Sequence, residues 1–239
     1  MPRPVDLYRS VDRTARQGGR PWVLANMVAG LDGSAAVGGR VGALSSPVDQ
    51  QLFRELRSVA DVVLVGAETV RREGYGPVRL PEDLQERRRQ EGRERLPRLA
   101  IVSGSLRLPW GSPLFSGAER PYVVTSEMGA PEGLREAADA AELVLAGRRR
   151  VDVVTALSEL SARGAQVVLC EGGPSLLGEL VAADALDELC LTIAPVLGGD
   201  PLPVAVTPDG GAALLRLELA SALVDDATLF LRYERTGAR

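Results

Sequence analysis

The chain has neither lysine nor histidine, so all 28 of its basic residues are arginines. Without lysine there is no amine for a Schiff base and no lysine for a phosphate-binding P-loop. Without histidine there is no imidazole to act as a base, to pair with a serine nucleophile or to bind a metal, so no metal site is expected. The arginine codons that a GC-rich genome favours would explain the missing lysine. Any acid–base step must therefore use carboxylates, water, tyrosine or a bound cofactor.

Other shortages narrow the classes of protein further. Cys170 and Cys190 are the only cysteines, and both lie in apolar strand-like runs without metal-binding spacing, which predicts buried, reduced thiols. No apolar run approaches the roughly 18 residues of a membrane span, and a cytoplasmic protein without membrane contact is expected. The net charge of −4 and pI near 5.2 make nucleic acid an unexpected partner.

The 239 residues, 45% of them hydrophobic, suffice for one domain or for one domain with an insertion. We expect an N-terminal arm over residues 1–20 and one domain over 21–235 with a charged insertion at about 74–97. Residues 85–95 of this insertion, most of them charged, favour a solvated helix or a mobile segment.

Two passages predict a strand, a glycine turn and then a helix: residues 62–70 and residues 167–180. Each has four apolar residues, too few for a helix, before Gly66 or Gly172-Gly173. Such a turn places backbone N–H groups at a helix N-terminus, where anions bind. One such turn alone is ordinary in an α/β protein. Two in one domain favour a dinucleotide site, although the first strand, Trp22 to Val28, lacks the Rossmann fingerprint.

The remaining pattern predicts an α/β fold with a mostly parallel sheet flanked by helices. Segments 215–220 and 227–234 alternate apolar and polar residues and predict an antiparallel C-terminal hairpin at one sheet edge. Further strands are expected at 99–102, 122–125 and from Glu188 to Pro195. Helices are expected from Pro47, where Leu52 and Leu56 share one face, and near 132–140 and 153–163.

Several short motifs occur in an order and spacing that resemble the pyrimidine reductase family of riboflavin biosynthesis. They are Leu31-Asp32-Gly33, Ser46-Pro47-x-Asp49 with Leu56-Arg57, Gly66-x-x-Thr69, Glu171-Gly-Gly-Pro-Ser-Leu, and Asp187-Glu188-Leu with Ala194-Pro195 and Leu197-Gly198. The family forms the C-terminal reductase domain of a bifunctional deaminase-reductase and has a dihydrofolate-reductase-like fold. The resemblance covers about residues 21–233, and nothing in the chain resembles the zinc deaminase half, so a stand-alone reductase is expected.

The resemblance implies an NADPH-dependent oxidoreductase. Members reduce the ribose of 5-amino-6-(5-phosphoribosylamino)uracil, or of its 2,5-diamino analogue, to the ribityl form. Two alternatives stay open: reduction of another ring substrate, such as dihydrofolate or a pterin, and nucleotide binding without catalysis. Family members commonly pair through their sheets, so a homodimer is expected.

The resemblance also implies substrate contacts. Arg57 matches a family position that meets the substrate, and Glu171 matches a substrate-contacting glutamate at a strand end. Asp32 and Asp49 are further carboxylates that could orient the sugar or manage a proton through water, so Asp32 and Glu171 are the candidate catalytic residues. Asp32 could instead cap its turn, and Asp49 could serve the helix dipole. Arg79 is a candidate for binding the substrate phosphate.

The candidate cofactor contacts follow both turns and the end of the strand at 99–102. The resemblance places Val28 beside the nicotinamide and the two turns on either side of the pyrophosphate, and the loop with Ser103 offers groups for the 2′-phosphate of NADPH. The full set is Val28, Gly66, Thr69, Glu73, Ser103, Gly172, Gly173, Pro174, Ser175, Leu176, Leu177 and Gly178.

The chain departs from the family at three places. Several members have a serine and a tryptophan where this chain has Val41 and Ala43, and Glu73 stands where the family has aspartate. The following substrate loop is replaced by the sequence of residues 74–79. These three departures bear on the expected substrate more than on the expected cofactor.

Overall fold

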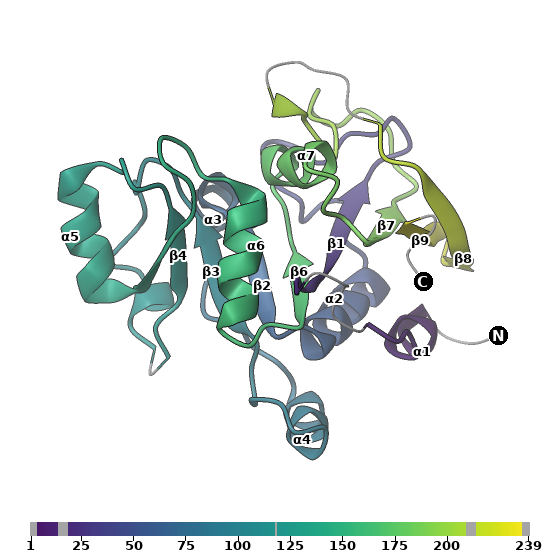
Figure 1. The fold of residues 1–239 in the computed structure, drawn as a ribbon. Helices are drawn as coiled ribbons and strands as arrows, with labels where there is room; N and C mark the ends of the chain where they lie inside the picture. Colours follow the sequence, from purple (N-terminus) through teal and green to yellow (C-terminus); the bar gives the residue numbers. More distant parts are fainter. Residues whose placement is uncertain (1–3, 14–18, 118, 209–213, 236–239) are drawn as a thin grey trace.

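A computed structural model describes residues 4–13, 19–117, 119–208 and 214–235 (Figure 1). The strands are β1 (Trp22–Ala29), β2 (Val62–Gly66), β3 (Arg98–Val102), β4 (Tyr122–Thr125), β5 (Glu142–Leu145), β6 (Val167–Cys170), β7 (Glu188–Ile193), β8 (Leu217–Asp225) and β9 (Thr228–Arg235). The α-helices are α1 (Pro4–Arg9), α2 (Pro47–Val59), α3 (Ala67–Glu73), α4 (Glu82–Gln90), α5 (Pro131–Ala140), α6 (Val153–Ala162) and α7 (Pro174–Ala182), with a 3-10 turn at Pro113–Phe115.

The described strands form one sheet in the order β5-β4-β3-β2-β6-β1-β7-β9-β8. The pairs from β5 to β7 are parallel, whereas β9 runs antiparallel to both β7 and β8. The predicted α/β class and the antiparallel C-terminal hairpin are therefore confirmed. Strand β5 was not among the expected strands, although Leu143, Val144 and Leu145 form a short apolar run; it is the edge strand, and only Val144 of its four residues is buried.

Helices cover both faces of the sheet, and alternate residues of the central strands serve the two faces. In β2, Val63 and Val65 belong to the core beneath α2 and α3, whereas Val62 and Leu64 belong to the core beneath α6 and α7. Figure 1 shows α6 and α7 across the face that is turned towards the viewer. Because both faces are buried, the central strands are continuous apolar runs.

Helix α2 begins as its sequence predicts. The Ser46 side chain accepts a hydrogen bond of 3.2 Å from the Asp49 N–H, and Pro47 occupies the first turn, where a missing N–H costs nothing. Leu52 and Leu56 are buried against the sheet. This start fixes the direction in which α2 runs towards Arg57.

The charged segment 74–97 forms α4, which Figure 1 shows beyond the end of the sheet. The expectation of a solvated helix holds for Arg89 and Glu86, which pair at the surface. It is wrong for Arg88, which is 1% exposed; the preceding Leu84 is also buried, at 3% exposed. These two side chains attach α4 to the domain.

Described parts of the expected N-terminal arm lie against the domain; residues 1–3 and 14–18 are outside the described residues. The Arg13 guanidinium donates two hydrogen bonds of 2.7 Å to Glu188, and both side chains are buried. Arg20 similarly donates to Asp187 at 2.6 and 2.7 Å. The Asp187-Glu188 motif therefore anchors the arm. The division into arm and domain stays a prediction.

Cys170 and Cys190 are buried and free, as predicted, and burial raises the pKa of the Cys170 thiol to about 12. Neither thiol is a ready nucleophile at neutral pH. None of the described helices has both the length and the apolar character needed to cross a membrane.

Candidate functional site

A cavity of about 390 Å³ opens at the carboxyl edge of the sheet. Its walls come from β1 and from the segments that follow β1, β2, β3, β5, β6 and β7. Because β2 pairs with β6, the two glycine turns lie side by side, and the Gly66 N–H donates to the Gly172 carbonyl at 2.8 Å. The cavity is lined by ten of the residues expected at the site, namely Gly66, Thr69, Glu73, Ser103, Glu171, Gly172, Gly173, Pro174, Ser175 and Leu176.

The glycines leave room that a side chain would fill. A Cβ added at Gly173 would lie 2.7 Å from the Thr69 Oγ1, and one at Gly66 would lie 3.4 Å from the Gly173 nitrogen. Helix α7 starts at Pro174 without a side-chain cap, so its first N–H groups have no side-chain acceptor. An uncapped helix N-terminus of this kind attracts anionic groups.

Ser103, directly after β3, carries a buried hydroxyl that lacks a partner. Its backbone N–H donates to the Val124 carbonyl at 2.9 Å, but its Oγ forms no hydrogen bond with any described residue, although the side chain is only 2% exposed. A buried polar atom without a partner costs about 1–3 kcal/mol. Since Ser103 lines the cavity, a ligand in the cavity could supply the missing partner.

Glu171 follows β6, and its carboxylate accepts hydrogen bonds from two side chains. Arg57 binds it bidentately, with Nε 2.6 Å from Oε1 and Nη2 2.7 Å from Oε2, and the Tyr75 hydroxyl also donates to Oε2. The Arg57 guanidinium lies 4.1 Å from the centre of the Phe53 ring. The side chains of Arg57 and Glu171 are 13% and 1% exposed.

The electrostatics of this group follow from burial and from the Glu171 charge. Burial alone lowers the pKa of Arg57, but the hydrogen bonds and charge of Glu171 outweigh it, and the net pKa is raised. Burial and the Glu171 charge both raise the pKa of Tyr75. Arg57 therefore remains a cation and Tyr75 remains a neutral hydrogen-bond donor at neutral pH.

Asp32 takes part in a reciprocal clamp between two loops, the one after β1 and the one after β7. Its Oδ1 accepts from the Ser34 hydroxyl at 2.5 Å, and its Oδ2 accepts from the Gly198 N–H at 2.7 Å. In return, Asp200 accepts from the N–H groups of Gly38 and Gly39 at 3.0 and 2.7 Å. The Ser34 hydrogen bond, followed by the Gly198 amide, lowers the pKa of Asp32.

This clamp joins the loops that supply one wall of the cavity, including Ala36 and Leu202. The donors around the Asp32 carboxylate agree with the capping alternative. Asp32 itself is exposed and does not line the cavity. Its catalytic role stays a prediction.

The remaining expected residues lie outside the cavity lining. Asp49 is buried and accepts from the hydroxyls of Thr192 and Ser45 at 2.7 and 2.5 Å. Arg79 is exposed on the segment before α4. The roles expected for these two residues stay predictions.

Three expected cofactor contacts are part of the packing. Val28 packs with Leu44 and Ala194, and Leu177 belongs to the core. At Gly178 an added Cβ would lie 1.8 Å from the Val206 carbonyl oxygen, so this glycine allows the following loop to pack on α7. Their expected contacts with a cofactor stay predictions.

Several residues of the site are not among those expected from the sequence. Met27, and not Val28, lines the cavity, since neighbouring strand residues point to opposite faces. Arg72 also lines it. Tyr75 was missed as a partner of Glu171, and its only signal was an aromatic residue between two glycines in the segment where the chain departs from the family.

Comparison with known proteins agrees with this geometry. The family model described as the RibD C-terminal domain matches residues 21–231. The chain belongs to this family. The match spans the whole described sheet apart from the last residues of β9.

Similar proteins include curated reductases from two archaea. The chain is 26% identical to the 2,5-diamino-6-ribosylamino-4(3H)-pyrimidinone 5′-phosphate reductase of Archaeoglobus fulgidus, with 90% of this chain and 100% of that protein covered. It is 29% identical to the reductase of the same name from Methanothermobacter thermautotrophicus, with 91% and 100% covered. Among solved structures, a pyrimidine reductase-like protein from Corynebacterium diphtheriae has a TM-score of 0.82 at 30% identity, with 90% and 92% covered.

Proposed function

We propose that the protein is an NADPH-dependent reductase that converts the ribose of 5-amino-6-(5-phosphoribosylamino)uracil, or of its 2,5-diamino analogue, to the ribityl form. The observation that carries the proposal is the meeting of the two glycine turns with the Arg57–Glu171 pair at one cavity. The names of the archaeal relatives favour a phosphorylated pyrimidine over dihydrofolate, a pterin or binding without turnover.

The cavity suits a nicotinamide dinucleotide. Thr69 and the N-terminus of α7 would hold the pyrophosphate between them, since the Gly66 and Gly173 positions keep this space free of side chains. The Ser103 hydroxyl would find its partner on the 2′-phosphate side. The cofactor supplies the hydride, and the protein supplies its binding and orientation. Met27 would form the apolar floor beside it.

Arg57 and Glu171 would hold the substrate next to this cofactor. A guanidinium that is fixed by a carboxylate keeps its plane and its charge, so further N–H groups of Arg57 can meet an anion or a hydroxyl without reordering. Tyr75 keeps its proton and holds Glu171 from a second side. Because lysine and histidine are absent, any proton transfer near the sugar must use carboxylates, tyrosine, the cofactor or water.

The test follows NADPH absorbance with the purified protein and compares the phosphoribosylamino-pyrimidine with dihydrofolate at matched concentrations. Oxidation with the pyrimidine alone is expected. Oxidation with dihydrofolate alone, or with neither compound, would reject the function. The same assay with NADH tests the coenzyme, and equal turnover with both would remove the proposed role of the 2′-phosphate.

We further propose a homodimer formed through the C-terminal strands. The register aligns Ile193, Leu229 and Val224 across β7, β9 and β8, on the side opposite the buried Phe230. Leu229 and Val224 are 37% and 67% exposed, and Leu219 on the same hairpin is 55% exposed. An apolar sheet face of this kind is typical of a contact with another chain.

Light scattering after size exclusion tests the dimer. Twice the chain mass of 25.3 kDa is expected, and Val224→Asp should give the mass of one chain. Val154→Asp is a matched control, because Val154 is also half-exposed but lies on α6. A wild-type mass of one chain, or a dimer that survives Val224→Asp, would contradict this interface.

A further inference from the structure

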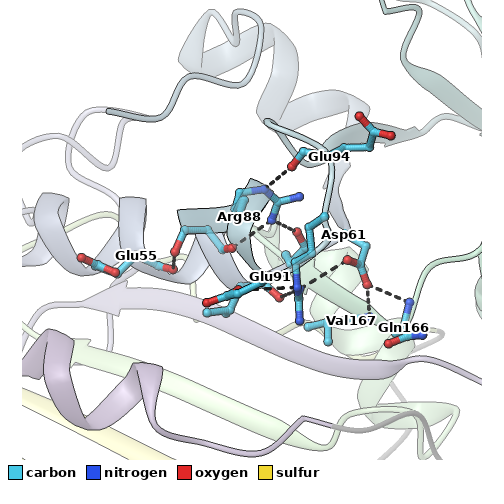
Figure 2. Close-up of polar contacts among 11 residues, drawn as sticks. Glu55, Asp61, Arg88, Glu91, Glu94, Gln166 and Val167 are labelled. Atoms are coloured by element: carbon cyan, nitrogen blue, oxygen red, sulfur yellow. Dashed lines mark hydrogen bonds and ion pairs between the residues drawn. The ribbon is translucent and has the colours of Figure 1, made fainter. Parts of the chain in front are cut away.

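Arg88 of α4 directs its guanidinium at the end of another helix. Its Nη1 donates to the carbonyls of Ser58 and Ala60 at 2.9 and 2.5 Å, and its Nε donates to the Glu94 carbonyl at 2.7 Å. Figure 2 shows the guanidinium between Glu94 and the end of α2. The side chain is only 1% exposed, and all three acceptors are backbone carbonyls and not carboxylates.

Two of the three carbonyls, those of Ser58 and of the C-cap residue Ala60, lie at the end of α2, where a helix leaves carbonyls unpaired. Helix α2 ends at Val59, so the last carbonyls lack amide partners from a following turn and carry the negative end of the helix dipole. Arg93 adds a hydrogen bond of 2.5 Å from its Nη1 to the Val59 carbonyl. Burial, and then the charge of Arg93, lower the pKa of Arg88. The helix end offsets the cost of burying this cation.

The same cluster fixes the start of β6. Asp61 accepts from Arg93 at 3.3 Å, and its other oxygen accepts from the N–H groups of Gln166 and Val167 at 2.8 and 2.9 Å (Figure 2). Strand β6 then runs directly to Glu171. The end of α2, which carries Arg57, and the start of β6, which leads to Glu171, are thus held together.

We propose that Arg88 is a positioning residue for the substrate site. By holding the last carbonyls of α2 it fixes the turn that presents Arg57 to Glu171, an inference that rests on the proposed role of this pair. The segment that carries Arg88 also carries Tyr75, which donates to Glu171. Residues 74–97 therefore support the pair from both sides, through Tyr75 at the carboxylate and through Arg88 at the helix.

Arg88→Met tests the proposal, because methionine keeps an apolar stem and removes the donors. The KM for the pyrimidine phosphate should rise about 10-fold while kcat stays within about 2-fold, since a small displacement of a binding group weakens its contact. The Kd for NADPH, measured by fluorescence titration, should not change. The control is Arg89→Met, which removes a neighbouring arginine that is 52% exposed and pairs with Glu86 within α4. An unchanged KM in Arg88→Met would overturn the proposal.

A double-mutant cycle separates positioning from general damage. In an Arg57→Met background, Arg88→Met should no longer raise KM, because the group through which it acts is gone. A full additional rise in KM would overturn the proposal. If Arg88→Met does not fold, Arg93→Met replaces it, because Arg93 binds the same helix end and its side chain is 28% exposed. Arg93→Met should raise KM in the wild-type background and leave KM unchanged in the Arg57→Met background. An equal rise in KM in both backgrounds would overturn the proposal.

The failure of the proposed function is recognisable separately, as wild-type protein that oxidises no NADPH with the pyrimidine. In that case the rate of amide hydrogen exchange at residues 57–61 shows whether Arg88 positions the end of α2. Faster exchange in Arg88→Met than in Arg89→Met would support the positioning of α2, and equal exchange would overturn it.

Discussion

The two edges of the sheet use polar residues in opposite ways. At the carboxyl edge, glycines keep a cavity of about 390 Å³ open, and the Ser103 hydroxyl has no hydrogen-bond partner among the described residues. At the amino edge, a cavity of about 550 Å³ is lined by charged side chains of both signs, in equal number: Arg88, Arg93, Arg98 and Arg163 against Asp61, Glu91, Glu94 and Glu119. The arginines there mostly contact carbonyls and carboxylates of the protein itself.

The difference shows how a polar cluster built for a ligand is distinguished from one built for the fold. The amino-edge groups satisfy one another, so a ligand would have to replace existing hydrogen bonds. At the carboxyl edge, by contrast, the Ser103 hydroxyl and the first N–H groups of α7 lack side-chain partners that a ligand could supply. The Arg57–Glu171 pair stands between these cases, because Glu171 borders the open cavity while its carboxylate is already paired with Arg57.

The largest effect is expected for Glu171→Gln, which breaks the buried ion pair at the carboxyl edge. Arg57 would keep its charge without a charged partner, and unfolding free energy should fall by about 3 kcal/mol. In the same variant kcat/KM should fall by about 100-fold or more. Urea denaturation and steady-state kinetics measure both. Glu68→Gln, which breaks an exposed pair with Arg72, should change stability by less than about 1 kcal/mol. Equal losses of stability in Glu171→Gln and Glu68→Gln would contradict the expected difference between the buried Arg57–Glu171 pair and the exposed Glu68–Arg72 pair.

Gly173→Ala should weaken NADPH binding by about 10-fold, or about 1.4 kcal/mol. The new Cβ would meet the Thr69 Oγ1 at 2.7 Å and occupy the space between the turns. Gly104→Ala is the matched control, because Gly104 lines the same cavity but nothing lies within 4 Å of an added Cβ. Titration of protein fluorescence with NADPH gives both constants. If both variants bind alike, the space between the turns does not hold the cofactor.

Ser103→Ala should have opposite effects on the free and the bound protein. Removing a buried hydroxyl without a partner should leave the melting temperature of the free protein unchanged or higher. Affinity for NADPH should drop about 5-fold, the value of one hydrogen bond of about 1 kcal/mol. Thermal shift with and without NADPH measures the two effects. A lower melting temperature together with unchanged affinity would mean that the hydroxyl serves the fold.

The smallest effect is expected for Asp32→Asn, which tests the loop clamp. The pKa of Asp32 is lowered in the folded protein, so its contribution to stability is present above the unfolded value of about 4 and is lost as pH falls through the folded value. The variant should be less stable at neutral pH, and its disadvantage should shrink below about pH 4. Chemical denaturation between neutral pH and pH 3 gives the difference. A disadvantage that does not change with pH would exclude the charge as the cause.

The sequence predicted the elements whose signals are local. The apolar runs at β2 and β6, the glycines after them and the serine cap of α2 all depend on neighbouring residues. These features also brought Gly66, Thr69 and Gly173 into one expected site. The structure places all three at the cavity.

The missed features depend on distant partners. Tyr75 meets Glu171 across 96 positions, and Arg88 meets Ala60 across 28, so nothing adjacent to either residue reveals the contact. A run of charged residues gives no sign that one of them is buried. The choice between Met27 and Val28 depends on which face of β1 each one occupies, and a strand buried on both faces does not reveal this in its sequence.

The most direct test of the account is a crystal structure of the protein with NADP⁺ bound. We predict the pyrophosphate between Thr69 and the N-terminus of α7, a polar atom of the cofactor within hydrogen-bond distance of the Ser103 Oγ, and the nicotinamide beside Met27. Cofactor bound in the amino-edge cavity, or bound at the carboxyl edge without contact to Thr69 and α7, would contradict the assignment of the two edges.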